Sequence, residues 1–314
     1  MPYYTLSPRT ELSQYHLLFN DSTIKILKLL YEFKLATGWQ LCRFMLQQDK
    51  NSYIYKKVNL MWQTGLLDSF KVYVHAGRFG NPLYYTLSKQ GLDALHEFAH
   101  YEPGWLKGYP KPAEMLSLPN FPHEARIVEL ASQESINQPK DKRFTIDFFG
   151  EMMSKGRDYI NDKIVEAFSP DYTVIYTFTK SGQEIRLHTE YERTRKSYRA
   201  ILDKLNRYHN YFSYPNNKDD KKEFVIRFIF QTPGMERGFW LNLILNAPSR
   251  SSMKIITTNL ALITGSKDFT QTIYANYQAI NLVKNPKLNV VIPYAKRLRL
   301  VEFDGSGAET ENKS

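Results

Sequence analysis

Apolar residues in the first hundred positions recur mostly at intervals of three and four, the spacing that places them on one face of a helix. Several stretches show this pattern, and each follows a residue whose side chain can cap a helix N-terminus. Residues 70–74 and 83–87 are typical of two strands, and the glycines and Pro82 between them indicate a hairpin. The pattern predicts three helices, a hairpin and a closing helix. The expected N-caps are Asp21 or Ser22, Thr37, Asn51 or Ser52, and Ser88.

The helix expected after Asn51 has two different faces. Ile54, Val58 and Met61 share an apolar face at spacings of four and three, so they should be buried. Polar and aromatic side chains on the other side should point into solvent, and the hairpin loop adds a basic residue. This candidate surface consists of Ser52, Tyr55, Lys56, Asn59, Gln63 and Arg78.

Three helices, a hairpin with a basic loop and a last helix resemble the winged-helix domain, a helix-turn-helix variant, over roughly residues 17–102. In that family the third helix enters the major groove of double-stranded DNA and the hairpin touches the backbone. The resemblance therefore implies that the candidate surface contacts DNA, with Arg78 in the wing. Winged helices also serve as dimerisation or protein-docking modules, so DNA binding is one of two interpretations.

Prolines cluster between residues 103 and 122, and a different pattern follows them. Because proline lacks a backbone donor and stops helices, we expect an extended linker there. The linker would separate a first domain over 1–102 from an α/β domain over 123–303. The last residues, 304–314, mix glycine, serine and acids without an apolar anchor, which predicts a disordered tail.

Residues 184–192 alternate strictly between two faces, as expected of a strand. Glu190 and Glu192 therefore project side by side. Like charges this close repel each other, so the pair suits a solvated sheet edge or a divalent cation between the carboxylates. The helix expected next has one apolar stripe with Lys204 at its margin, beside Tyr208, which places this lysine within reach of the sheet.

Pro170-Asp171, the hairpin that follows, Glu190-Tyr191-Glu192 and the helix with Lys204 and Tyr208 resemble the PD-(D/E)XK nuclease core, and more closely the replication-relaxation family. Members of that family combine an N-terminal winged helix with a nuclease-like C-terminal domain, and are linked to plasmid replication or mobilisation in bacteria. The resemblance implies an α+β chain, with a winged helix-turn-helix domain followed by an α/β nuclease-like domain with a mixed sheet. It also implies nicking or relaxation of the DNA of a plasmid, integrative element or phage.

In such a nuclease-like site, Mg²⁺ or Mn²⁺ would bind to Asp171 and Glu190, with Glu124 as a further acid. The metal would activate water and stabilise the charge on the scissile phosphate. The chain departs from the core motif at Glu192, where the motif has lysine, so Lys204 is the candidate for that role. The candidate catalytic residues are Asp171, Glu190, Glu192 and Lys204.

A nuclease-like fold without activity is the alternative interpretation. The chain would then be a DNA-binding regulator of transcription or replication, and its second domain would mediate dimerisation or docking. The expected partners are double-stranded DNA, a second copy of the chain, and the replication or transfer proteins of a mobile element.

Charge agrees with a nucleic-acid partner. The 42 basic and 32 acidic residues give a net charge of +10 and a pI of about 9.3, which favours a polyanion.

The single cysteine, Cys42, excludes an internal disulfide and a thiolate zinc site. The N-terminal residues lack a secretory signal and no apolar run is long enough to span a membrane. We therefore expect a cytoplasmic protein without membrane insertion.

A competing motif lies near the end of the first domain. His96-Glu97-Phe98-Ala99-His100 matches the zincin pattern H-E-x-x-H, in which one helix brings both imidazoles to a zinc ion. Its position just before Pro103 argues against a protease, because a zincin needs a buried helix that packs against a sheet. No P-loop or dinucleotide-binding motif occurs in the sequence.

Overall fold

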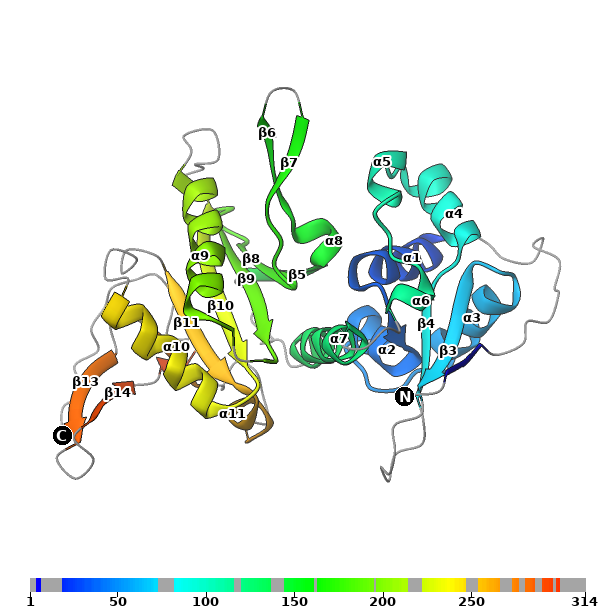
Figure 1. The fold of residues 1–314 in the computed structure, drawn as a ribbon. Helices are drawn as coiled ribbons and strands as arrows, with labels where there is room; N and C mark the ends of the chain where they lie inside the picture. Colours follow the sequence, from blue (N-terminus) through cyan, green and yellow to red (C-terminus); the bar gives the residue numbers. More distant parts are fainter. Residues whose placement is uncertain are drawn as a thin grey trace. The chain divides into compact units, whose positions relative to one another are not determined.

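The chain is a mixed α+β protein that divides into two compact units (Figure 1). Unit 1 consists of Met1–Asn137, Phe148–Lys155 and Ser169–Thr173, and unit 2 consists of Gln138–Asp147, Gly156–Phe168 and Val174–Ser314. The structure is a computed structural model. It describes residues 4–6, 19–72, 82–115, 120–136, 144–160, 163–194, 196–213, 222–246, 254–265, 273–276, 280–285, 290–295 and 298–299.

Unit 1 begins with the predicted series of helices. Thr37, Asn51 and Ser88 are N-caps, as expected, and the Thr37 cap is a capping box with Gln40. The first helix is capped by Asn20, one residue before the expected position, and the Asn20 side chain accepts from the Thr23 N–H. These helices are α1 (Asp21–Phe33), α2 (Gly38–Leu46), α3 (Ser52–Gln63) and α4 (Lys89–Ala99).

A small antiparallel sheet accompanies these helices. The predicted strand pair is present, and Leu67 pairs with Leu87 and Lys71 with Leu83. The hairpin loop, with Arg78, lies outside the described residues. The strands, in the order β1-β3-β4-β2, are β1 (Tyr4–Leu6), β3 (Leu67–Val72), β4 (Leu83–Leu87) and β2 (Ala36–Thr37).

The proline-rich segment belongs to unit 1 and is packed against it. It contains two short helices, α5 (Pro103–Leu106) and α6 (Pro112–Met115). Between them, the Tyr109 hydroxyl lies 2.7 Å from the Lys34 carbonyl oxygen, to which it donates, and accepts from the Leu87 N–H at 3.2 Å. These bonds hold the segment on the end of α1, so the part of the expected linker that the structure describes is an ordered piece of unit 1.

Three later segments complete unit 1. They are α7 (Asn120–Ile136), the end of β5 (Phe144–Gly150) with α8 (Glu151–Ser154), and the start of β8 (Tyr172–Phe178). Gly150 lies directly on α1, since a Cβ there would be 2.3 Å from the Glu32 carbonyl oxygen. The Gly150 N–H also donates to Glu32 Oε2 at 3.1 Å. Only glycine allows this close approach of the two backbones.

Unit 2 contains a mixed sheet. Within the described part of the chain the strand order is β15-β12-β11-β10-β9-β8-β5, and the division between the units falls inside β5 and β8. β10 is parallel to both of its neighbours, and β11 and β12 are antiparallel. The further strands are β9 (Glu184–Glu192), β10 (Lys222–Phe230), β11 (Ile255–Asn259), β12 (Ile273–Asn276) and β15 (Leu298–Arg299).

Two helices, α9 (Tyr198–Ser213) and α10 (Pro233–Asn246), pack on the same face of the central strands. Phe228 and Phe230 of β10 form one buried cluster with Leu205 of α9 and with Phe239 of α10. Because strand residues alternate, the β9 residues in register with these phenylalanines face the same helices. The remaining elements are the hairpins β6 (Gly156–Ile160) with β7 (Lys163–Phe168) and β13 (Ile280–Asn285) with β14 (Val290–Ala295), and helix α11 (Leu260–Gly265).

β11 ends at Asn259, and α11 begins at the next residue. The Asn259 side chain accepts from the Leu262 N–H, which caps the new helix, and donates to Glu236 of α10. None of the helices that the structure describes is long and apolar enough to cross a bilayer.

Candidate functional site

The predicted DNA-contacting residues of unit 1 lie on α3. Ile54, Val58 and Met61 are at most 1% exposed, which confirms the predicted buried face of this helix. On the opposite side most of the candidate side chains are exposed to solvent, and the last one is half-buried. In sequence order these residues are Ser52, Tyr55, Lys56, Asn59 and Gln63.

The start of α3 is firmly held. The Asn51 side chain accepts from the N–H groups of Tyr53 and Ile54, and the Tyr53 hydroxyl lies 3.0 Å from the Ser22 hydroxyl at the start of α1. The ring of Tyr55 lies against Gly38, where a Cβ would come within 2.6 Å of it. Gly38 thus lets α2 approach α3 closely, and Tyr55 is fixed with 40% of its surface exposed.

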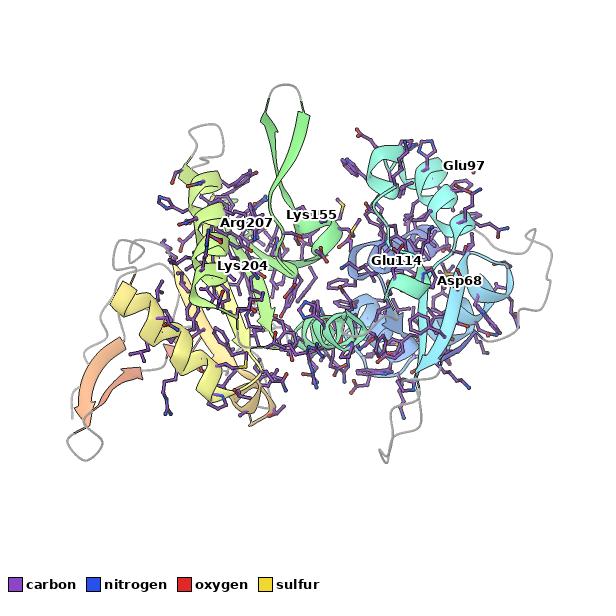
Figure 2. The ribbon with its side chains drawn as sticks, in the orientation of Figure 1. Asp68, Glu97, Glu114, Lys155, Lys204 and Arg207 are labelled. Carbon is purple, nitrogen blue, oxygen red and sulfur yellow. The ribbon has the colours of Figure 1, made fainter. Side chains whose placement is uncertain are left out.

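The strongest concentration of buried charge in the described part of unit 2 lies between β9 and α9. Lys204 lies on α9 (Figure 2), and its ammonium is 2.5 Å from Glu190 Oε2 and 3.1 Å from Glu192 Oε1. The two carboxylate side chains are only 2% and 5% exposed, and that of Lys204 is 17% exposed. The prediction that the two acids project together and that Lys204 reaches them is therefore confirmed.

Further donors complete the β9–α9 cluster. The Tyr208 hydroxyl donates to Glu190 Oε1 at 2.7 Å, so both oxygens of this carboxylate accept from α9. Lys196 adds a more exposed ammonium, 2.8 Å from Glu192 Oε2. Two carboxylates and two ammonium groups therefore balance in charge.

His188 lies next to the cluster on the same face of β9. It is packed among aromatic rings and adds no positive charge. Its ring stacks on Phe224 at 5.9 Å and on Phe212 at 5.6 Å. Burial, with a smaller contribution from Arg186, lowers the pKa of His188 to about 3, so the imidazole is neutral at physiological pH.

Asp171 and Glu124, the other predicted metal ligands, belong to unit 1, where each has a basic partner. His123 Nε2 lies 3.3 Å from Asp171 Oδ1, and the Lys34 ammonium lies 2.8 Å from Glu124 Oε1 and also pairs with Glu151. Burial raises the pKa of Glu124, although Lys34 acts in the opposite direction. Burial alone would lower the pKa of His123 and of Lys34, but the carboxylates beside them prevail and raise both.

We tested whether these residues fit a divalent cation. In the parts of the chain that the structure describes, no group of three or more His, Cys, Asp or Glu side chains is arranged to hold a metal ion. Both oxygens of Glu190 accept from Tyr208 and Lys204, and Lys204 fills the space between Glu190 and Glu192. The residues as arranged hold an ammonium group where a divalent cation would bind, so they do not fit the metal.

The H-E-x-x-H motif does not form a zincin helix. His96 is in the last turn of α4, but His100 lies beyond its end, with a φ of 57° in the left-handed region. His96 Nδ1 is 2.8 Å from the Tyr101 carbonyl oxygen. The two imidazoles therefore do not lie on one helical face, which the zincin site requires.

Sequence reasoning missed two buried polar groups of unit 2. Glu236 is 2% exposed and accepts from the Thr257 hydroxyl and from the Asn259 amide, both at 2.6 Å. Arg227 is completely buried and donates from Nε and Nη2 to the Thr189 hydroxyl. For Arg227 the sequence signal was a charged residue inside the apolar run 224–230, and such residues are rarely buried without partners. Glu236 lies in the mixed first turn of α10 and gives no such signal.

Comparison with protein-family models, with curated proteins and with solved structures finds no significant match to this chain. The resemblance to the replication-relaxation family therefore rests on residues and on the order of elements.

Proposed function

We propose that this chain is a DNA-binding protein that recognises its site through α3 and acts in the replication or mobilisation of a bacterial mobile element. The observation that carries the proposal is the exposed row on α3, opposite a completely buried face. The order of elements in unit 1, with three helices, a strand pair and a closing helix, supports the proposal because it is similar to that of a winged helix. The net charge of +10 favours a polyanionic partner.

The side chains on α3 suit base and phosphate contacts. An asparagine such as Asn59 can pair with adenine through two hydrogen bonds, and a lysine such as Lys56 can bind guanine or a phosphate. Tyr55 adds an aromatic ring and a hydroxyl. This mixture of donors, acceptors and a single charge is more typical of a base-reading helix than of a purely electrostatic surface.

For unit 2 we propose a nuclease-like fold that binds DNA without cutting it. The order β5, β8, β9, α9 and β10 along the chain, with α8, β6 and β7 inserted after β5, supports this proposal because it is similar to that of the nuclease core. The four strands among them are neighbours in the sheet in the same order. The carboxylates of Glu190 and Glu192 are neutralised by Lys204 and Lys196, which supports a structural role over a metal-dependent one.

Metal-dependent nicking is the second candidate function. The observation that favours it is the position of Lys204, because an active nuclease of this type needs a cation next to its carboxylates. Nicking would require Lys204 to move away from Glu190 when DNA and metal bind.

The first experiment selects sequences from a pool of random duplexes with the full-length protein. We expect an enriched motif whose selection is lost with Asn59→Ala and kept with Lys89→Ala, a control at an exposed position on α4. A pool that shows no enrichment and no binding would contradict the proposal.

The second experiment incubates supercoiled plasmid with the selected site and Mg²⁺ or Mn²⁺, and compares wild type with Glu190→Gln and Asp171→Asn. We expect binding without relaxation in all three. Relaxation that requires both carboxylates and is abolished by EDTA would instead establish the nickase.

A further inference from the structure

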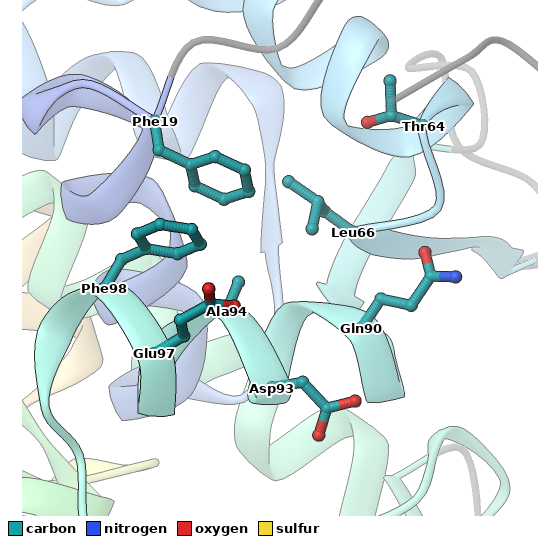
Figure 3. Close-up of a pocket in the computed structure, with 8 residues that line it drawn as sticks. All are labelled: Phe19, Thr64, Leu66, Gln90, Asp93, Ala94, Glu97 and Phe98. Carbon is teal, nitrogen blue, oxygen red and sulfur yellow. The ribbon is translucent and has the colours of Figure 1, made fainter. Parts of the chain in front are cut away.

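A pocket of about 300 Å³ in unit 1 lies beside α4 (Figure 3). Phe19 and Phe98 form one wall, with their rings stacked at 4.3 Å between centroids and an interplanar angle of 16°. They are 38% and 44% exposed, which is unusual for phenylalanine. Leu66 and Ala94 form the apolar base.

The pocket is acidic in a basic protein. Asp93 and Glu97 are one helical turn apart on α4, and both are exposed. No hydrogen bond or ion pair to either carboxylate comes from another residue that the structure describes. Gln90, one turn earlier, adds an amide oxygen, and none of the eight lining residues is basic.

Exposed aromatic rings beside two carboxylates favour one kind of ligand. A phosphate backbone would be repelled by the two carboxylates, so DNA is not the occupant. A cation with a flat surface is favoured, because it can lie on an aromatic face while its donors reach the acids. Guanidinium has this shape and carries five donors, whereas the ammonium of lysine is a compact and strongly hydrated charge.

We propose that the pocket binds an arginine side chain presented by a basic segment of a partner protein. The guanidinium group lies on the exposed ring of Phe98 or Phe19 and donates to Glu97, while Asp93, one turn earlier on α4, adds a second negative charge. This site uses other residues than the proposed DNA-binding surface on α3. It gives unit 1 a second partner, which is positively charged where DNA is negatively charged.

The test measures binding of the peptide Gly-Gly-Arg-Gly-Gly to the full-length protein by saturation-transfer NMR, a method suited to weak binding. The comparison peptides have lysine or citrulline in place of arginine. Citrulline keeps the planar shape and loses the charge, so we expect binding in the order arginine, lysine, citrulline. Equal binding of arginine and citrulline would overturn the proposal.

Protein variants locate the site. We expect Asp93→Asn with Glu97→Gln to weaken binding of the arginine peptide at least about tenfold, because a charge-assisted hydrogen bond and a second negative charge are lost. Glu102→Gln, an exposed control in the same unit, should have no effect. These changes are exposed and nearly isosteric, and a thermal melt establishes that each variant folds. Unchanged binding in the double variant would overturn the proposal.

Two other occupants are distinguished, one by the same binding assay and the other by sedimentation. If the peptide binds only when Arg9 of this chain is replaced by alanine, the chain's own N-terminal segment fills the pocket and the proposal is wrong. If the double variant abolishes a concentration-dependent self-association seen by sedimentation, the occupant is a second copy of the chain, which also overturns it.

Discussion

Replacing Lys204 by methionine tests the β9–α9 cluster directly. The substitution keeps the length and apolar character of the side chain, but removes the ammonium that lies against both Glu190 and Glu192. Both carboxylates are almost fully buried, so water cannot take the place of the missing charge. We expect the free energy of unfolding of unit 2 to fall substantially.

The size of the effect follows from burial. Breaking a buried ion pair by removing one partner costs about 3–5 kcal/mol, and an exposed pair contributes about 0–1 kcal/mol. Lys204 is 17% exposed and Lys196 is 39% exposed. We therefore expect about 3 kcal/mol for Lys204→Met and less than about 1 kcal/mol for the matched control Lys196→Met.

Hydrogen exchange measured by mass spectrometry is the appropriate assay, because it reports on β9 and α9 without assuming that the two units unfold together. A loss of about 3 kcal/mol raises the exchange rate of protected amides by roughly a hundredfold. Adding Glu190→Gln to Lys204→Met should restore part of the protection, since one buried charge is removed. Equal, small effects of the two lysine variants would refute the reasoning.

Three further predictions concern Glu32 of α1, Gly150 beside it, and Gly238 of α10. Burial raises the pKa of Glu32 to about 7 from its ordinary value of 4.5, despite the Gly150 N–H and Lys28. The folded chain therefore keeps a proton that the unfolded chain releases, so stability falls as pH rises from about 4.5 to about 7 and is constant above that window. Glu32→Gln should reduce the stability difference between pH 5 and pH 8 by about 2–3 kcal/mol in urea titrations, and an unchanged pH profile would contradict the raised pKa. Gly150→Ala should destabilise unit 1 by about 1–3 kcal/mol, because its Cβ would meet the Glu32 backbone. Gly238 lies in α10, where a Cβ would meet nothing within 4 Å. Gly238→Ala should therefore stabilise unit 2 by about 0.5–1 kcal/mol and raise its urea midpoint. A loss of stability would show that α10 is not a regular helix.

Local features could be predicted from the sequence because their causes are local. Caps at Thr37, Asn51 and Ser88 depend on a side chain that reaches only a few residues ahead. The two faces of α3 and the alternation along β9 depend only on helix and strand periodicity. The position of Lys204 followed in the same way, from an apolar stripe that fixes how α9 lies on the sheet.

Contacts between distant residues could not be predicted in this way. Lys34 pairs with Glu124, 90 residues later, and with Glu151, 117 residues later, and nothing near Lys34 in the sequence indicates either partner. The same applies to Asn259, which ends β11 because it both caps α11 and donates to Glu236. Pro103 and Pro112 begin the short helices α5 and α6 instead of ending helices, and Tyr109 anchors the segment to unit 1.

The central claim is that α3 binds DNA, and the salt dependence of binding tests it most directly. We would measure the affinity of wild type, Lys56→Ala and the control Lys89→Ala for the selected duplex at several salt concentrations by fluorescence anisotropy. We expect Lys56→Ala to weaken binding and to reduce the slope of log affinity against log salt by about one, with Lys89→Ala unchanged. Equal slopes and affinities for all three proteins, or no binding at all, would contradict the account.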